Sequence, residues 1–286
     1  MPEICIIPPA GEPVHLDEAK NDRRVDFDAD NSKVRGLIAS ARQAAESKTK
    51  LQLLHARWKL ILDTFPTGSC NNFQQFPSTT NIPAYAIRLP HAPLVDVVSI
   101  QYVDMAGVLQ TMPQTDYVVN AAMRPGIITP CFGKIWPIPL PQIGSVMVTY
   151  DAGFASPFIT AGTLAPNQFK VIGPVTWKVG DTINFYNSGG ALPAPLDASL
   201  PYTIASAGNG IYTLTDVFGI PVTFTSQGTG RNFIGVVPEG IISWMMLRIG
   251  SLYESREEVA ILNKGKLEVL PYVDRMLDPY ITDLYL

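Results

Sequence analysis

The sequence predicts an α+β protein in which a small helical bundle, formed by the N- and C-terminal segments, carries an antiparallel β domain and a second, inserted all-β domain. Apolar residues recur at helical spacing near both ends of the chain, within Leu16–Lys48 and Pro238–Tyr280, and strand-like sequence fills the region between them. Neither helical end can bury its apolar stripe alone, so we expect the two ends to pack together. The composition changes at Asp151–Gly153, which predicts that a separate β domain begins there.

These observations predict the following division of the chain. Residues 1–13 are rich in proline and form an extended N-terminal arm. Residues 14–50 and 238–286 form the helical core. Residues 51–153 form the antiparallel β domain, and residues 154–237 form the inserted β domain, of barrel or sandwich type.

The N-terminal helical part contains two predicted helices. Leu16–Lys20 carries acidic residues in its first turn, where the helix dipole favours them. The next helix shows one apolar stripe, and either Asp28 or Asp30 can cap it. The residues of this stripe are Val34, Leu37, Ile38, Ala41 and Ala45.

The first β domain is predicted from alternating and β-branched runs. Leu51–Leu62 alternates and is interpreted as a strand, with a helix as the alternative. The turn Asp104–Gly107 joins a strand at Val97–Val103 to one at Val108–Thr111, and residues 67–83 form a long loop. Short connections predict one small, mostly antiparallel sheet. Its further strands are Tyr117–Asn120, Gly126–Pro130 and Val146–Tyr150.

The inserted domain is poor in charge and rich in Gly/Pro turns. Its predicted strands are Thr182–Tyr186, Tyr202–Ala205, Ile211–Thr215 and Pro221–Thr225. Pro238 then opens a helix at a position that proline favours. Pro271–Leu277 is a candidate last short helix, and the tail follows it.

The composition limits the classes of function. Only 16% of the 286 residues are charged, against roughly 25% in typical soluble domains. The net charge is −4 and the pI is near 5.4, without the basic excess of a protein that grips phosphates. Three scattered cysteines predict small buried side chains rather than a metal site or a disulfide. We expect no signal peptide, no membrane span and no cofactor.

No catalytic motif is present. The sequence lacks the nucleophile elbow, the zinc-protease helix, the Walker loop and the dinucleotide-binding glycine pattern. His15, His55 and His91 lie in different predicted elements without metal-ligand spacing. Asp63 paired with one of Glu254, Glu257 and Glu258 is the remaining acid–base alternative, and a solvated or interface helix face explains these glutamates better. We therefore expect no enzyme.

Several segments, in this order along the chain, resemble the head–tail connector (adaptor, or head-completion) family of long-tailed bacteriophages. They cover residues 14–153 and 238–286. The matching segments are Leu16–Lys20, Leu37–Thr49, Leu62–Pro66, Leu89–Leu94, Val98–Asp104 with Gly107, Ile241–Glu257 and Pro279–Tyr280.

The resemblance implies a structural virion protein of the neck. Such subunits form a homo-oligomeric ring, commonly twelve-fold, beneath the phage portal protein. The ring extends the DNA channel and offers a platform for a stopper, tail-terminator or other neck protein. DNA passes through the lumen without sequence-specific binding, and assembly takes place in the bacterial host cytoplasm.

The resemblance also implies that the C-terminal segment docks on the portal. In this chain the candidate anchors are Tyr272, Leu277, Tyr280, Leu284 and Tyr285, since aromatic residues dominate interface hot spots. Packing of these side chains on their own subunit is the open alternative. Arg256, Glu257 and Glu258 are candidates for ion pairs between neighbouring subunits.

The insert departs from the usual member of that family and resembles a small β module of phage tail and fibre proteins. The segments that carry this likeness are Gly180–Phe185, Gly189–Leu196, Tyr202–Ile204, Tyr212–Leu214 and Gly228–Gly230. A decoration or spacer is the favoured interpretation. A tail-associated protein that binds a receptor or carbohydrate through residues 154–237 is the alternative function.

Overall fold

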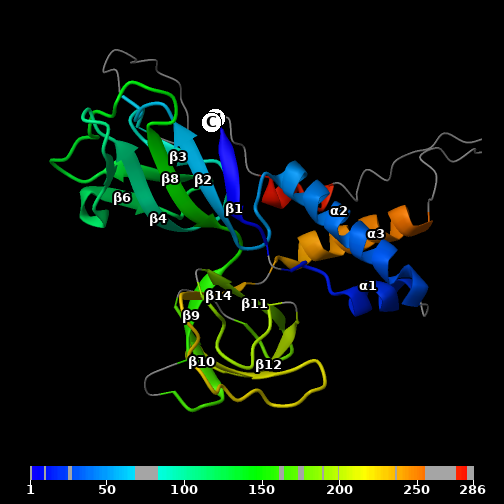
Figure 1. The fold of residues 1–286 in the computed structure, drawn as a ribbon. Helices are drawn as coiled ribbons and strands as arrows, with labels where there is room; N and C mark the ends of the chain where they lie inside the picture. The colour runs from blue at the N-terminus through cyan, green and yellow to red at the C-terminus, as the bar shows by residue number, and fades with distance from the viewer. Residues whose placement is uncertain are drawn as a thin grey trace, which may run out of the picture. The chain divides into compact units, whose positions relative to one another are not determined.

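The computed structural model divides into two compact units (Figure 1). Unit 1 contains residues 1–8 and 50–153, and unit 2 contains residues 9–49 and 154–281. The structure describes residues 2–9, 11–24, 28–67, 83–160, 164–172, 177–188, 190–198, 200–235, 237–254 and 275–281.

Unit 1 is built from two antiparallel sheets. The five-stranded sheet has the order β1 (Glu3–Ile7), β2 (Ala56–Leu62), β8 (Val146–Ala152), β4 (Leu94–Val103) and β5 (Leu109–Thr111). The three-stranded sheet has the order β3 (Ile87–Leu89), β7 (Gly126–Pro130) and β6 (Tyr117–Asn120).

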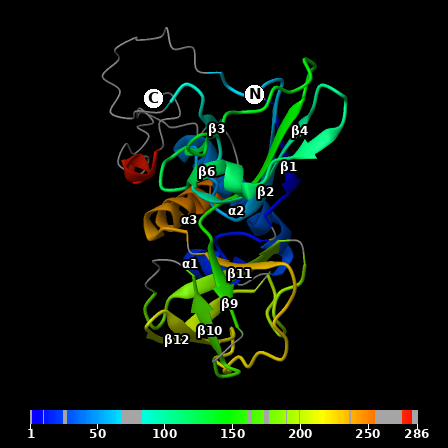
Figure 2. The ribbon, with the colours of Figure 1, turned by 90° about the vertical axis from the view of Figure 1, so that its left-hand side faces the viewer.

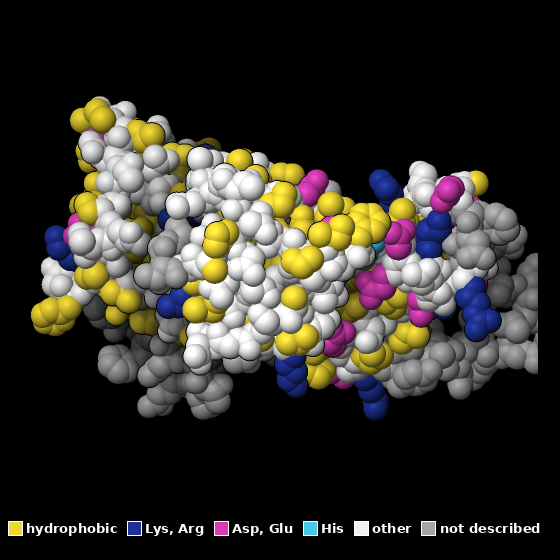
Figure 3. Space-filling model, turned by 90° about the horizontal axis from the view of Figure 1, so that it is seen from below, with side chains coloured by type: hydrophobic (Ala, Val, Ile, Leu, Met, Phe, Trp, Pro, Cys, Tyr) yellow, Lys and Arg dark blue, Asp and Glu magenta, His cyan; other side chains and the backbone are white. Residues whose placement is uncertain are grey.

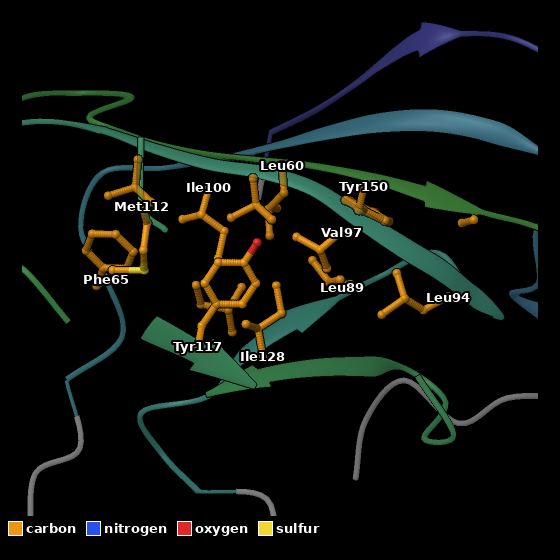
Figure 4. Packing of buried hydrophobic residues seen from close by; sticks show 14 residues of the cluster. Leu60, Phe65, Leu89, Leu94, Val97, Ile100, Met112, Tyr117, Ile128 and Tyr150 are labelled. Carbon is orange, nitrogen blue, oxygen red and sulfur yellow. The ribbon is translucent and has the colours of Figure 1, made fainter. Parts of the chain in front are cut away.

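One apolar core lies between these two sheets (Figure 4). Leu60, Ile100 and Tyr150 come from the five-stranded sheet, and Leu89 and Ile128 come from the three-stranded sheet. All of these side chains are fully or almost fully buried. Each sheet thus covers the apolar face of the other, as in a sandwich.

The strands at Tyr117–Asn120 and Gly126–Pro130 are confirmed with the predicted bounds, but the prediction of a single sheet is wrong. Alternation shows which residues face a core and does not show which strands pair. The predicted strand Leu51–Leu62 is confirmed only from Ala56 onward. Leu51 is buried before the strand and makes an isolated bridge with Ala92.

The N-terminal residues have the extended backbone expected of an arm, but they are paired. β1 lies antiparallel to β2, with Cys5 opposite Trp58. Glu3 Oε2 lies 2.8 Å from His91 Nε2, and the His91 ring stacks on Trp58 with centroids 3.7 Å apart. These contacts hold β1 at the edge of the five-stranded sheet.

The helices of unit 2 come from both ends of the chain and pack together, as predicted (Figure 1). They are α1 (Leu16–Arg23), α2 (Asn31–Thr49) and α3 (Glu239–Glu254), with short 3-10 turns at Asp28–Asp30 and Asp278–Tyr280. α2 buries four of its five predicted stripe residues: Val34, Ile38, Ala41 and Ala45. α3 buries Ile241, Trp244, Met245 and Ile249 against them.

Polar contacts fix the two ends to each other. Arg23 Nη2 donates to the carbonyl oxygen of Met246 at 3.0 Å. The Tyr253 hydroxyl donates to Asp30 Oδ2 at 2.6 Å, and Lys33 Nζ lies 4.5 Å from the centre of the Tyr253 ring. Helical segments far apart in the sequence therefore share apolar and polar contacts.

The β strands of unit 2 form a closed barrel (Figures 1 and 2). Its order is β10 (Gln168–Val171), β13 (Ile211–Thr215), β12 (Tyr202–Gly208), β11 (Thr182–Ser188), β14 (Arg231–Gly235) and β9 (Ser156–Ile159). Phe158, Phe169 and Phe185 meet edge to face in its core, with ring centroids 5.0–5.8 Å apart. Closure leaves no strand edge for uncontrolled pairing.

The predicted strand Pro221–Thr225 is not part of this barrel. Pro221 makes only an isolated bridge with Thr215, because proline has no N–H for a ladder. The sequence analysis also missed β9, β10 and β14. β9 pairs with β14, so the first and last strands of the barrel lie side by side.

Candidate assembly surfaces

The described residues bring together no group of three or more His, Cys, Asp or Glu side chains that could hold a metal ion. The candidate acid Asp63 accepts a hydrogen bond from the Gly144 N–H at 2.9 Å. Glu254 lies 3.9 Å from the Arg23 guanidinium. Asp63 thus fixes a loop of unit 1, and Glu254 faces an arginine of unit 2. Glu257 and Glu258 lie outside the described residues.

A buried ion pair joins the end of β8 to the start of β2. The Asp151 carboxylate is fully buried and accepts two hydrogen bonds from Arg57, Nε at 2.7 Å and Nη2 at 2.9 Å. His55 Nε2 lies 3.7 Å from the same carboxylate. Burial raises the pKa of Asp151, but the hydrogen bonds and charge of Arg57 and His55 outweigh it and leave that pKa below its ordinary value.

Gly153, at the end of unit 1, occupies a position that other residues cannot fill. Its φ of +132° lies outside the range of L side chains, and a Cβ there would lie 2.6 Å from the Leu54 backbone. Its N–H donates to the Pro93 carbonyl oxygen at 2.9 Å. Close backbone packing therefore fixes the conformation of the chain at the end of unit 1.

Unit 1 exposes many apolar side chains on two loops. Phe132 is fully exposed, and Ile143 is 91% exposed. The exposed large apolar residues of the hairpin between β4 and β5 and of the loop from β7 to β8 are Met105, Val108, Leu109, Phe132, Ile135, Ile138 and Ile143. Exposed apolar residues that recur along neighbouring segments mark an interaction surface.

The tip of the β4–β5 hairpin is held rigid by Asp104. Its Oδ1 accepts from the N–H groups of Ala106 and Val108, both at 2.9 Å, and its Oδ2 accepts from Gln110 Nε2 at 2.8 Å. Hydrogen bonds from Val108 and Gln110 hold the pKa of Asp104 below its ordinary value. Gly107 supplies the positive φ of +79° that the turn requires.

A hollow of about 500 Å³ lies beside the β7–β8 loop, and aromatic side chains line it. Trp136 is fixed there, because it stacks on Phe65 with centroids 4.9 Å apart and donates from Nε1 to the Tyr85 carbonyl oxygen at 2.7 Å. Phe132 and Cys131 also line the hollow. Lys134 is neutralised by Asp116 at 3.1 Å.

The barrel presents a surface with few charges (Figure 3). Its tip at Asp216–Ile220 repeats the turn of the β4–β5 hairpin: Asp216 Oδ1 accepts from the N–H groups of Phe218 and Ile220, and Gly219 has a φ of +79°. Phe218 at this tip is 84% exposed. The β4–β5 hairpin and the turn that follows β13 thus present apolar side chains on turns of the same rigid type.

Two of the five predicted portal anchors lie among the described residues. Leu277 is buried, and the Tyr280 ring lies against Gly240 at the start of α3, where an added Cβ would lie 2.9 Å from the ring. Both therefore have contacts within their own chain. Tyr272, Leu284 and Tyr285 lie outside the described residues, as do Arg256, Glu257 and Glu258. No helix in the described part of the chain is long and apolar enough to cross a membrane.

No protein-family model matches the sequence, and no curated protein matches it. Two solved chains share its fold over its full length. One belongs to the "Virion of native gene transfer agent (GTA) particle", with 15% identity and a TM-score of 0.55. The other belongs to the "Neck of empty GTA particle computed with C6 symmetry", with 16% identity and a TM-score of 0.55. All of this chain and 98% of each of those chains are covered.

Proposed function

We propose that this protein is a structural component of a phage-like virion, a head-to-tail adaptor that forms a ring beneath the portal. The observation that carries the proposal is the shared fold, which extends over the whole chain and 98% of a chain from a particle neck. The adaptor-like segments at both ends of the sequence point to the same place in a particle. For the ring, the family resemblance implies twelve copies.

The surfaces of unit 1 support a role in assembly. Its two loops expose apolar side chains that a ring would bury between subunits or against a neck protein. Rings use heterologous contacts, in which one face of a subunit meets a different face of its neighbour. A net charge of −4 also suits a channel that lets DNA pass without tight phosphate contacts.

We propose further that residues 271–286 dock on the portal. The anchors are Tyr272, Leu277, Tyr280, Leu284 and Tyr285, and this role requires Leu277 to leave its buried site or to support its neighbours from it. Arg256, Glu257 and Glu258 form ion pairs between subunits. The ring also contacts a stopper or tail-terminator protein on its far side. A ring of this kind has no catalytic function.

Deletion of the gene, followed by electron microscopy of the particles, tests the proposal. We expect separate heads, packaged or leaking, beside finished but unattached tails, and restoration of joined particles by the intact gene. Joined particles that form normally without the gene would refute the adaptor role.

The alternative is a tail-associated protein that binds a receptor or carbohydrate through residues 154–237. The observation that favours it is the charge-poor barrel surface with the exposed tip at Phe218. A gene with residues 155–236 removed separates the two functions. Joined particles that fail only to adsorb would favour the alternative, and adsorption at the normal level would exclude it.

A further inference from the structure

We propose that β1 is a releasable edge strand, and that the protonation of His91 controls its attachment to the five-stranded sheet. Protonated His91, in the loop between β3 and β4, and ionised Glu3 of β1 form an ionic clamp, which opens when the imidazole loses its proton. The inference concerns unit 1 alone. It goes beyond the proposed function, because it holds wherever the protein lies in a particle.

Apart from the clamp, β1 has few attachments. In the sheet it pairs on one side only, with β2, and the ladder is irregular between Cys5 and Ile7. Ile4 and Ile6 are 52% and 43% exposed, and Cys5 is exposed as well. A strand with so little apolar burial opens locally at a lower free energy than the central strands of a sheet. The contacts of the Glu3 side chain therefore matter for holding β1.

The clamp is a short contact between opposite charges. Glu3 Oε2 lies 2.8 Å from His91 Nε2, and the two side chains are only 19% and 26% exposed. Nε2 makes no aligned hydrogen bond with any described group, so the attraction comes from charge and requires the protonated imidazole. The ring stacks on Trp58, with 3.7 Å between centroids and 17° between planes. This stacking holds the imidazole in position whether or not it carries the proton.

The surroundings of Glu3 make its charge depend on His91. Tyr150 is fully buried, and its pKa is raised, first by burial and then by the negative charge of Glu3, so this carboxylate lies near the buried phenol. Among the described residues, no other cation pairs with Glu3. A neutral imidazole therefore leaves a largely covered carboxylate without a counter-charge, which is unfavourable. Release of β1 returns this carboxylate to water.

The other ionisable groups near His91 do not change charge in the same pH range. On the strands packed against it, the titratable side chains on the same face are Glu3, Cys5 and Tyr150. Arg57 and Lys59 of β2 alternate with Trp58 and so point to the opposite face of the sheet. Glutamate ordinarily titrates at about pH 4.3 and cysteine at about pH 8.5, whereas histidine changes charge between about pH 5 and 8. A response of β1 within that range therefore reports on the imidazole.

Hydrogen exchange of the full chain, measured by mass spectrometry on the peptide that contains β1, tests the clamp. After correction for the intrinsic exchange rate, we expect the protection of β1 at about pH 5.5 to exceed that at about pH 7.5 by roughly two- to fivefold, the effect of one partly exposed ion pair. β5, the other edge strand of the sheet, should change little. Glu3→Gln, and His91→Phe, which keeps a ring on Trp58, should show the weaker protection at both pH values.

The matched control is His15→Gln, because His15 lies in unit 2 and its replacement should leave the pH response of β1 unchanged. Cys5→Ser should keep the response as well, since the thiol is not part of the clamp. Equal protection of β1 at the two pH values, an equal change in β5, or a full response in Glu3→Gln would overturn the inference. These outcomes are independent of the gene-deletion test of the proposed function.

Discussion

Replacement of Asp151 by asparagine should destabilise unit 1 strongly. The substitution keeps the size of the side chain but turns one acceptor oxygen into an NH₂ group, which meets the Arg57 guanidinium donor to donor. Breaking a buried ion pair from one side costs roughly 3–5 kcal/mol. We expect about 3 kcal/mol, the lower end of that range, because the Arg57 side chain keeps 15% exposure and the nearby charge of Asp96.

Urea unfolding followed by tryptophan fluorescence measures this loss. Trp58 and Trp136 report on unit 1, and the signal of Trp177 and Trp244 in unit 2 is common to all the variants compared. With a urea slope of about 1.5 kcal/mol per molar, the unit 1 midpoint should fall by about 2 M. Asp116→Asn is the control. Its partner Lys134 is 56% exposed, so the loss there should stay below about 1 kcal/mol. Equal losses in the two variants would refute the account of a buried, stabilising pair.

Three further predictions concern single positions. The pKa of Asp151 is lowered in the folded chain, so its ionised carboxylate stabilises the fold at pH values above the ordinary pKa of 3.8. This stabilisation is lost as the pH falls through the folded pKa. Acid unfolding of Asp151→Asn should therefore lack the loss of stability that protonation of Asp151 causes in the parent chain. Gly153→Ala should destabilise unit 1, whereas Gly36→Ala, on an open face of α2, should stabilise unit 2 by about 0.5–1 kcal/mol in thermal unfolding. Phe185→Ala should cost about 3–5 kcal/mol in the barrel, and a loss below about 1 kcal/mol in calorimetry would contradict the described core.

The fold class could be predicted from the sequence because the strongest signals in the sequence are local. The apolar residues of α2 and α3 recur at helical spacing within each segment, and the sequence Asp104–Gly107 by itself predicts a hairpin turn. The division of unit 1 into two sheets was not predictable in this way. Strand pairing depends on contacts between distant segments, such as β2 with β8, that no local pattern encodes.

The missed strands of the barrel have the same explanation. β9 and β10 are only four residues each, and β9 contains a proline, which is tolerated at strand positions that need no donor. Their assignment as strands depends on their pairing with distant strands in the closed barrel. The buried Asp151–Arg57 pair was also missed, since Arg57 alone is an ordinary polar position on an alternating strand and Asp151 follows the predicted strand Val146–Tyr150.

The candidate surfaces followed from the sequence only in part. The C-terminal anchors were chosen because the family resemblance implies docking by that segment and because aromatic residues dominate hot spots. Of these anchors, Leu277 and Tyr280 contact their own chain. The exposed loop at Phe132–Ile143 was not singled out, because its apolar residues and prolines are equally compatible with a buried connection. Exposure is a property of the folded chain, and the sequence offers no direct signal for it.

Cryo-electron microscopy of intact particles, with this chain fitted to the density, tests the central claim most directly. The account predicts a closed ring of copies between the portal and the first tail component, with residues 271–286 against the portal. Density for this chain at the tail tip or on fibres, or a particle that lacks the chain altogether, would contradict it.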